Sequence, residues 1–349
     1  MPAAAARPVA RLTSPGEIAA VVPVLCGFVP HESLVVISLR GPRKRIGLTM
    51  RFDLDWCDTA GLAPAEVADR LAYDGASLAL LVLHSETPDA ETPDNGGRAR
   101  AGLVAAVEQA CAAKGIVLSE ALLVRGGRWF SYLCTGRSCC PDQGTPLEGP
   151  TTPALQLVEA QRTLDGRAVL DSREELVRSL APPVLLAAVA AEQQIDRAVD
   201  AWLQRYDRDG REALRQRGIA AARAALARSL TPGGIDLAQA AELAVAVQDV
   251  HVRDEIATWA LTRHDELLAL LMQTARLVVP PDDAAVCTLL AWVAYAHGDG
   301  GLANVALARA LTSEPDYSLA LLLRQSLDRQ VPPTEVRRLL QATRKELRR

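Results

Sequence analysis

The chain has 349 residues, of which 49% are hydrophobic and 23% charged, and its formal net charge at pH 7 is −4. This length suits two domains of ordinary size, and the charge balance argues against a nucleic-acid partner, because such proteins typically carry a strongly basic surface. No apolar run approaches the ~20 residues that span a bilayer, so we expect no membrane partner. The seven cysteines are then reduced thiols of a cytoplasmic protein.

The first part of the chain, to about residue 150, predicts a mixed α/β domain. Its first helix has a clear start, because Ser14 can act as N-cap, Pro15 suits the first helical position and Glu17 completes a capping box. The first two strands are expected to pair as a hairpin. The expected elements are a helix over 15–25, strands over 34–39 and 46–54, a helix over 64–73, a strand over 78–83, a helix over 98–114, and strands over 117–124 and 128–133.

The periodicity changes after Pro153, and no further convincing strand follows. We therefore divide the chain into an α/β domain over 1–150 and an all-helical domain over 151–349. Glycine and proline separate the helices of the second domain, which are expected to form short antiparallel hairpins. These helices cover about 172–180, 184–206, 211–229, 236–247, 251–261, 264–275, 282–297, 301–312, 316–328 and 334–347.

One helix pair, near 282–328, resembles a tetratricopeptide-type repeat. Two apolar stripes flank a turn at 297–300, and the small residues Ala303 and Ala310 let the two helices approach closely. Three tandem copies are not found, so an open binding solenoid does not follow. A helical core that merely shares the hairpin geometry is the alternative.

Four separated motifs keep a distinctive order along the chain. They are VPVLCGF at 22–28 with SLVV at 33–36, RFDL at 51–54, RWFSY at 128–132 with Cys134 and CCP at 139–141, and AYAHGDG at 294–300 with ARAL at 308–311. Their order and spacing resemble, over nearly the whole chain, an actinobacterial family known as domain of unknown function 4192 (DUF4192). The resemblance implies a cytoplasmic protein of actinobacterial type, and it implies no particular activity.

Three of the seven cysteines, Cys134, Cys139 and Cys140, lie close together in the sequence. They follow an aromatic run that contains Trp129, Phe130 and Tyr132. One interpretation is a structural metal site, although zinc prefers four ligands and adjacent cysteine side chains are expected to diverge. A fourth ligand would then come from afar, for example Cys26, Cys57 or a histidine. A redox role is a second interpretation, although no C-x-x-C motif is present. The third, favoured by the burial preference of free cysteine, is that they are small apolar side chains closing the α/β domain.

Arg51, Asp53 and Asp55 alternate at the end of a predicted strand, so we expect them on one face of the sheet. If that face lined a cleft, the two carboxylates could act as acid, base or Mg²⁺ ligands while Arg51 bound an anion. The alternative is a solvent-facing charged edge with a local ion pair of small energetic value.

A weaker candidate for cofactor binding lies at Gly96, Gly97 and Arg98, which precede or open a predicted helix. Free N–H groups at a helix start can hold a phosphate, but the preceding loop is acidic and no Walker or G-x-G-x-x-G motif is present. The cofactor, if any, stays unknown. The histidines at 251, 264 and 297 show no metal-ligand spacing, so we interpret them as surface or satisfied core residues.

These observations favour a binding function. We expect a protein-interaction or scaffold role through the helical half, or the binding of a small ligand. The alternative is an enzyme that acts on a phosphorylated or other anionic substrate with Arg51, Asp53 and Asp55. The binding hypothesis requires an apolar or charged groove on the helical half, and the enzyme hypothesis requires the three residues around one pocket.

Overall fold

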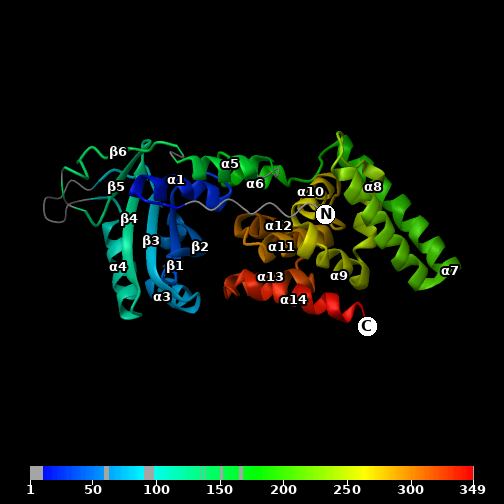
Figure 1. Ribbon diagram of the computed structural model, residues 1–349. Helices are drawn as coiled ribbons and strands as arrows, with labels where there is room; N and C mark the ends of the chain where they lie inside the picture. Colours follow the sequence, from blue (N-terminus) through cyan, green and yellow to red (C-terminus); the bar gives the residue numbers. More distant parts are fainter. Residues whose placement is uncertain are drawn as a thin grey trace. The chain divides into compact units, whose positions relative to one another are not determined.

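The computed structural model describes residues 11–58, 63–89, 98–134, 136, 138–149, 152–164 and 168–348. The chain forms two compact units, Met1–Arg173 and Glu174–Arg349. The first unit contains a mixed sheet with helices and the second is helical (Figure 1). The predicted fold class, an α/β part followed by a helical part, is confirmed.

In the described part of the first unit, the strands form one six-stranded sheet in the order β2-β1-β3-β4-β5-β6. Neighbouring strands are antiparallel except β3 and β4, which are parallel and are connected through helix α4. The predicted hairpin of the first two strands is present. The strands are β1 (Ser33–Arg40), β2 (Arg45–Asp53), β3 (Ala76–His84), β4 (Val117–Arg125), β5 (Arg128–Ser131) and β6 (Thr145–Pro146).

Side-chain alternation gives this sheet two buried faces. On one face, residues such as Leu34, Leu83 and Leu123 join a core with α3 and α4. The neighbouring residues in sequence point to the opposite face, where α1 lies against β2, β4 and β5. The helices of this unit are α1 (Pro15–Cys26), α2 (Leu54–Trp56), α3 (Pro64–Tyr73), α4 (Ala101–Ala113) and α5 (Pro153–Leu164).

Helix α1 begins where the sequence predicts. The Ser14 hydroxyl accepts a hydrogen bond from the Glu17 N–H at 3.2 Å, and the Glu17 carboxylate accepts from the Thr13 N–H at 2.6 Å and from the Thr13 hydroxyl at 2.8 Å. These bonds lower the pKa of Glu17, the backbone bond from Thr13 most of all. Two oxygens therefore satisfy amide groups that a helix start leaves unpaired.

Three elements of the first unit were not predicted. Helix α2 has three residues and strand β6 has two, too few for any periodicity, and α5 lies in a segment for which we expected no helix or strand. Leu155 on α5 packs on Val21 and Val24 of α1, so α5 belongs to the first unit. The two units consequently divide at Arg173, whereas the sequence pattern places the domain boundary at 150.

The second unit contains helices α6 to α14, close to the predicted ranges. The apolar α11 is buried along its whole length and forms an antiparallel hairpin with α12. No helix in the described ranges is long and apolar enough to cross a membrane. The helices are α6 (Arg173–Ser179), α7 (Leu186–Ser229), α8 (Leu237–Ala246), α9 (Val250–Thr258), α10 (Ala260–Leu277), α11 (Asp283–Ala296), α12 (Gly300–Ser313), α13 (Ser318–Asp328) and α14 (Pro333–Glu346).

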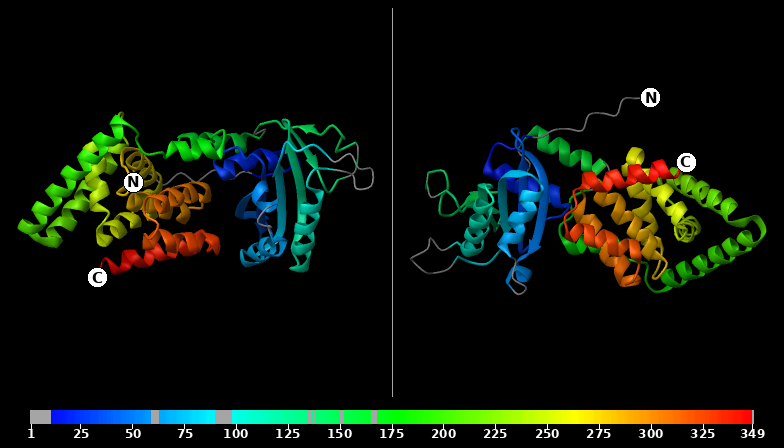
Figure 2. Two further views of the ribbon diagram at one scale, coloured as in Figure 1. Left: turned by 180° about the vertical axis from the view of Figure 1, so that it is seen from behind. Right: turned by 90° about the horizontal axis from the view of Figure 1, so that it is seen from below.

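Helix α7 is broken in its middle. Gly210 has φ 80° and ψ 171°, a conformation that only glycine adopts readily. The break matches the predicted separation of helices at 184–206 and 211–229. In the right-hand view of Figure 2 the two halves of α7 are straight segments that meet at an angle.

One buried ion pair joins several segments of the second unit. The Nε of Arg309 on α12 donates to the carboxylate of Asp283 on α11 at 2.7 Å, and Asp283 is fully buried. The same guanidinium donates to the backbone carbonyls of Ala275 at 2.7 Å, Val278 at 3.0 Å and Leu180. A buried charge is tolerated only when it is paired and hydrogen-bonded in this way.

We predict that Arg309→Met destabilises the helical unit by about 3–5 kcal/mol, because it leaves a buried carboxylate and three carbonyls without their donor. Chemical denaturation followed by far-ultraviolet circular dichroism measures the change. The exposed Arg329 serves as control, and Arg329→Met is expected to change the free energy of unfolding by no more than about 0.5 kcal/mol. Equal stability of the two variants would contradict the role given to Arg309.

Candidate functional site

The structure brings Arg51 and Asp53 together at the end of β2. Their side chains form an ion pair, and the Arg51 guanidinium also lies 5.5 Å from the centre of the Phe28 ring. The Asp53 side chain is 58% exposed. The two residues thus share a face, as the alternation predicts, and Asp53 already neutralises the charge that would attract an anionic substrate.

Asp55 does not join this pair on the strand. Strand β2 ends at Asp53, and the short helix α2 begins at Leu54. Leu54 is fully buried, and its N–H donates to the carbonyl of Glu32 at 2.9 Å. The turn that buries Leu54 therefore ends the alternation, so the expected single face of three charged residues is wrong for Asp55.

His84, at the end of β3, is a neighbour of Arg51. It is 6% exposed, and its Nε2 has no hydrogen-bond partner among the residues that the structure describes. Burial lowers the pKa of His84 to about 4, with smaller contributions from Arg51 and His31. The imidazole is therefore neutral at pH 7.

Asp53, Ser33 and His84 occupy one row across β2, β1 and β3, with Ser33 as the Cα partner of both others. This row has the residue types of a catalytic triad, but its bonds differ. The Ser33 hydroxyl donates to the backbone carbonyl of His31 at 2.6 Å, and Ser33 is fully buried. A nucleophile needs a base within hydrogen-bonding reach, so the row gives no support for nucleophilic catalysis.

At the weaker cofactor candidate, the structure describes Arg98, while Gly96 and Gly97 lie outside the described residues. Helix α4 begins only at Ala101. The Asp89 carboxylate accepts from the Ala99 N–H at 2.9 Å and from both terminal nitrogens of Arg125, at 2.9 and 3.0 Å. A carboxylate of the chain itself thus already occupies the Ala99 N–H and the Arg125 guanidinium beside this candidate.

Arg98 takes part in the packing of the aromatic run. Its guanidinium lies 5.0 Å from the centre of the Phe130 ring, and that of Arg125 lies 5.2 Å from the same ring. Each contact is a cation–π interaction, worth about 0.5–1 kcal/mol at an exposed site. Both Arg98 and Arg125 therefore pack on the aromatic run through Phe130.

The three clustered cysteines meet in the loop after β5. The sulfur atoms of Cys134, Cys139 and Cys140 all lie within 4.8 Å of one another, and those of Cys134 and Cys139 are 3.1 Å apart. Cys139 is exposed and the other two are half-buried. They are not the buried apolar residues that we favoured from the sequence, and the adjacent side chains converge where divergence was expected.

The thiols of this loop influence one another. Hydrogen bonds from Cys139 and Cys140 lower the pKa of Cys134. Burial and the bond to Cys134 raise the pKa of Cys140 to about 12. Among Cys134 and Cys140, loss of a proton is therefore easier at the Cys134 sulfur.

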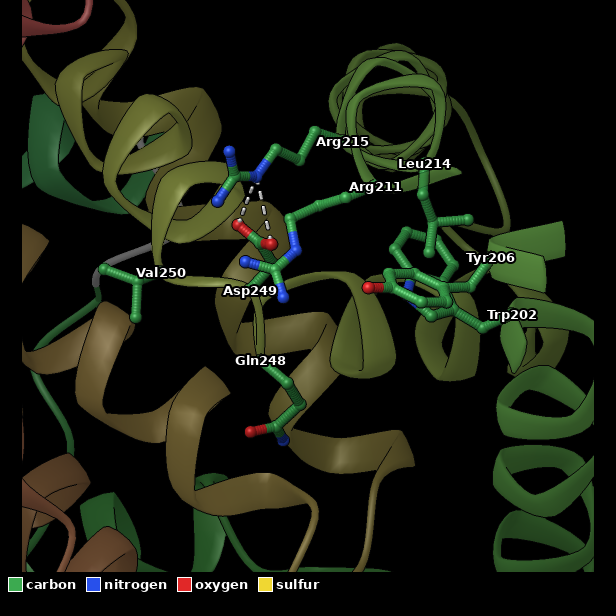
Figure 3. A pocket seen from close by; sticks show the side chains of 8 residues that line it. All are labelled: Trp202, Tyr206, Arg211, Leu214, Arg215, Gln248, Asp249 and Val250. Atoms are coloured by element: carbon green, nitrogen blue, oxygen red, sulfur yellow. Dashed lines mark hydrogen bonds and ion pairs between the residues drawn. The ribbon is translucent and has the colours of Figure 1, made fainter. Parts of the chain in front are cut away.

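The second unit contains a pocket of 360 Å³ that the sequence did not predict (Figure 3). It lies where the two halves of α7 meet the turn between α8 and α9. Trp202, Tyr206 and Leu214 gather on one side, and Arg211 extends from α7 toward the middle. The available signal was the run of Trp202, Tyr206, Arg211 and Arg215 about one helical turn apart around Gly210. The pocket is lined by Trp202, Tyr206, Arg211, Leu214, Arg215, Gln248, Asp249 and Val250.

An ion pair forms the wall opposite the aromatic rings. The Nε of Arg215 donates to both carboxylate oxygens of Asp249 at 3.1 Å, and Asp249 also accepts from the N–H groups of His251 and Val252 at the start of α9. Burial raises the pKa of Asp249, but these hydrogen bonds outweigh it and hold the pKa below its usual range. Arg211, by contrast, has no acidic partner in the described part of the chain.

His264 and His297 are a further pair that the sequence did not bring together. Their rings stack with centroids 3.5 Å apart. The Nδ1 of His264 lies 2.9 Å from the Asp265 carboxylate, and His264 is buried. His264 is thus a core residue, but its Nε2 has no hydrogen-bond partner in the described part of the chain, so it is not the satisfied core histidine that we expected. Among the described residues, no three metal-ligating atoms gather at this pair.

The family described as "Domain of unknown function (DUF4192)" matches residues 15–334 of the chain. This match agrees with the resemblance of the four sequence motifs. No curated protein and no solved structure matches the chain.

We predict that His84 makes the stability of the chain fall in mild acid. Its pKa is about 4 in the folded state against a usual value of 6.5, so as the pH falls below 6.5 the unfolded state binds the proton first and gains stability. Between pH 7 and pH 5 the wild type is expected to lose about 2 kcal/mol more free energy of unfolding than His84→Gln.

Urea denaturation at the two pH values measures this difference, and His251→Gln is the control because His251 is a half-buried histidine at the start of α9. Carboxylates contribute equally to the wild type and both variants, so they cancel. The same pH dependence in the wild type and His84→Gln would contradict the prediction, because it would mean that folding does not change the pKa of His84.

Proposed function

We propose that this chain, which belongs to the DUF4192 family, is a protein-binding module whose helical unit receives a segment of a partner polypeptide. The observation that carries the proposal is the 360 Å³ pocket in which two aromatic rings accompany an arginine without an acidic partner in the described residues. Tryptophan, tyrosine and arginine are the residues that most often dominate the energy of protein interfaces.

The surroundings of the pocket favour a polypeptide over a small molecule. The pocket is within the size range of small-molecule sites, but part of its apolar lining is open to solvent. Val250 is 56% exposed and Tyr206 43% exposed, and Leu203, next to Trp202 on α7, is 58% exposed. Exposed apolar surface next to a pocket is typical of sites that bind proteins.

The chemistry of the walls defines the segment that fits. Trp202 and Leu214 offer an apolar surface to an aliphatic or aromatic side chain. Arg211 offers five N–H donors to a carboxylate, and no ion pair joins it to Asp249, which Arg215 already holds. The preferred segment therefore carries an acidic residue close to an apolar one.

Two further features support a cytoplasmic binding protein. All seven cysteines are free thiols, as expected in a reducing compartment. The antiparallel hairpin of α11 and α12, followed by α13, has the helix order of one tetratricopeptide-type unit, and such units serve binding in many proteins.

The alternative, an enzyme for an anionic substrate that uses Arg51, Asp53 and Asp55, has less support. Arg51 is paired with Asp53, and the Asp53 carboxyl is largely exposed. Catalytic carboxyls are usually found in a cleft that shields them from solvent, whereas Asp53 faces solvent beside the cation that neutralises it.

We predict that peptides selected on the intact chain from a displayed random library are enriched in an acidic residue close to an aliphatic or aromatic one. Arg211→Glu is expected to weaken their binding at least about tenfold, or roughly 1.4 kcal/mol, because it places like charges together. Fluorescence anisotropy with labelled selected peptides measures the dissociation constants.

Arg329→Glu is the matched control, because Arg329 is an exposed arginine of the same unit outside the pocket. This variant should bind as tightly as the wild type. Selected peptides without acidic residues, or equal affinity of Arg211→Glu and the wild type, would refute the proposal.

A further inference from the structure

The loop after β5 holds three thiols that are close enough to share one metal ion, independently of the function proposed for the helical unit. The sulfurs of Cys134, Cys139 and Cys140 lie within 4.8 Å of one another. Thiolate sulfurs bound at about 2.3 Å to one tetrahedral zinc ion are roughly 3.8 Å apart. Small side-chain rotations therefore bring all three sulfurs to bonding distance.

Backbone hydrogen bonds hold the loop in this shape. The Ser131 hydroxyl accepts from the N–H of Leu133 at 3.1 Å and of Cys134 at 3.0 Å, which turns the chain out of β5. The carbonyl of Gly136 accepts from the N–H of Cys139 at 3.2 Å and of Cys140 at 2.8 Å. This turn folds the second half of the loop back over the first, so the sulfurs converge.

The space around the sulfurs also favours glycine at position 136. A Cβ on Gly136 would lie 3.0 Å from the Cys139 sulfur and 3.8 Å from the Cys134 sulfur. Any larger residue would extend into the volume between the thiols. Glycine leaves that volume open to an ion.

The return of the loop to the sheet is fixed as well. Arg128 on β5 donates through Nε to the carbonyl of Gln143 at 2.7 Å and through Nη2 to that of Gly144 at 2.8 Å. Strand β6 then pairs with β5. Both ends of the loop are consequently attached to the same strand, and the three cysteines lie between the two attachments.

We propose that Cys134, Cys139 and Cys140 bind one zinc ion as three thiolates, with the fourth position of the tetrahedron open to solvent or to an exogenous ligand. Thiolates are ligands that zinc prefers over the hard cations. Binding displaces the three thiol protons to water. Among the described residues, no fourth ligand atom joins the group, so Cys26 and Cys57, which the sequence suggested, are not part of it. The open position faces solvent beside Cys139, which is exposed.

A disulfide between two of these cysteines is the alternative to a metal site. It would join two of the thiols and leave the third without a partner. The convergence of all three on one volume, around a glycine that keeps it open, is explained by an ion and not by a disulfide.

The test is the metal content of the intact chain, purified with a phosphine reductant and without chelator and measured by inductively coupled plasma mass spectrometry. The wild type is expected to contain about one zinc ion per chain, and Cys134→Ser, Cys139→Ser and Cys140→Ser to lose most of it. Cys57→Ser is the matched control, because Cys57 is a half-buried thiol outside the group. It should retain the zinc.

A second measurement does not depend on the folding of the variants. Cobalt(II) added to the chelator-treated wild type should produce a sulfur-to-cobalt charge-transfer band that saturates at about one equivalent, and zinc should remove it. No zinc in the wild type together with no such band, or zinc retained in a variant that lacks all three cysteines, would overturn the proposal. A mass spectrum showing a disulfide within the loop under the same reducing conditions would also overturn it.

Discussion

The organisation of the helical unit depends on a single buried guanidinium. Arg309 reaches the carbonyls of Leu180, Ala275 and Val278 and the carboxylate of Asp283. These acceptors belong to the ends of different helical segments, and a buried cation is stable only when they stay in place. The requirement fixes α12 against the start of α11 and against the end of α10.

The pocket is built on this frame. Helices α7, α8 and α9 pack on α10 and α11, so the walls that carry Leu214 and Asp249 are attached to the most deeply buried part of the unit. The first half of α7, which supplies Trp202 and Tyr206, is exposed along most of its length. The pocket thus combines one fixed wall with one wall on an exposed helix, an arrangement that suits a partner segment of variable shape.

Charged groups in the α/β unit are used mainly to hold loops. At the ends of β3 and β4, Asp89 is bound by Arg125, and the Glu32 carboxylate accepts from the Ser85 hydroxyl at 2.8 Å and the Glu86 N–H at 2.7 Å. These carboxylates already occupy the nearby hydrogen-bond donors, so few donors are left for an external anion. The thiols of the cysteine loop differ, because their bonds are to one another and to a carbonyl.

The sequence predicts local features well because they depend on neighbouring residues. The helix start at Ser14, the first hairpin and the break at Gly210 follow from capping, alternation and glycine chemistry. The candidate sites depend on contacts between distant residues. Nothing in the periodicity places Trp202 beside Asp249 or stacks His264 on His297, and the turn at Gly136 reverses the expected divergence of Cys139 and Cys140.

The central claim is that a rigid frame around Arg309 carries the pocket, with the first half of α7 as its adaptable wall. Amide hydrogen exchange of the intact chain, followed by mass spectrometry, tests this most directly. We expect the slowest exchange of the unit in α11 and α12, slow exchange in the second half of α7, and much faster exchange over residues 186–209. Exchange in α11 as fast as in residues 186–209 would contradict the account.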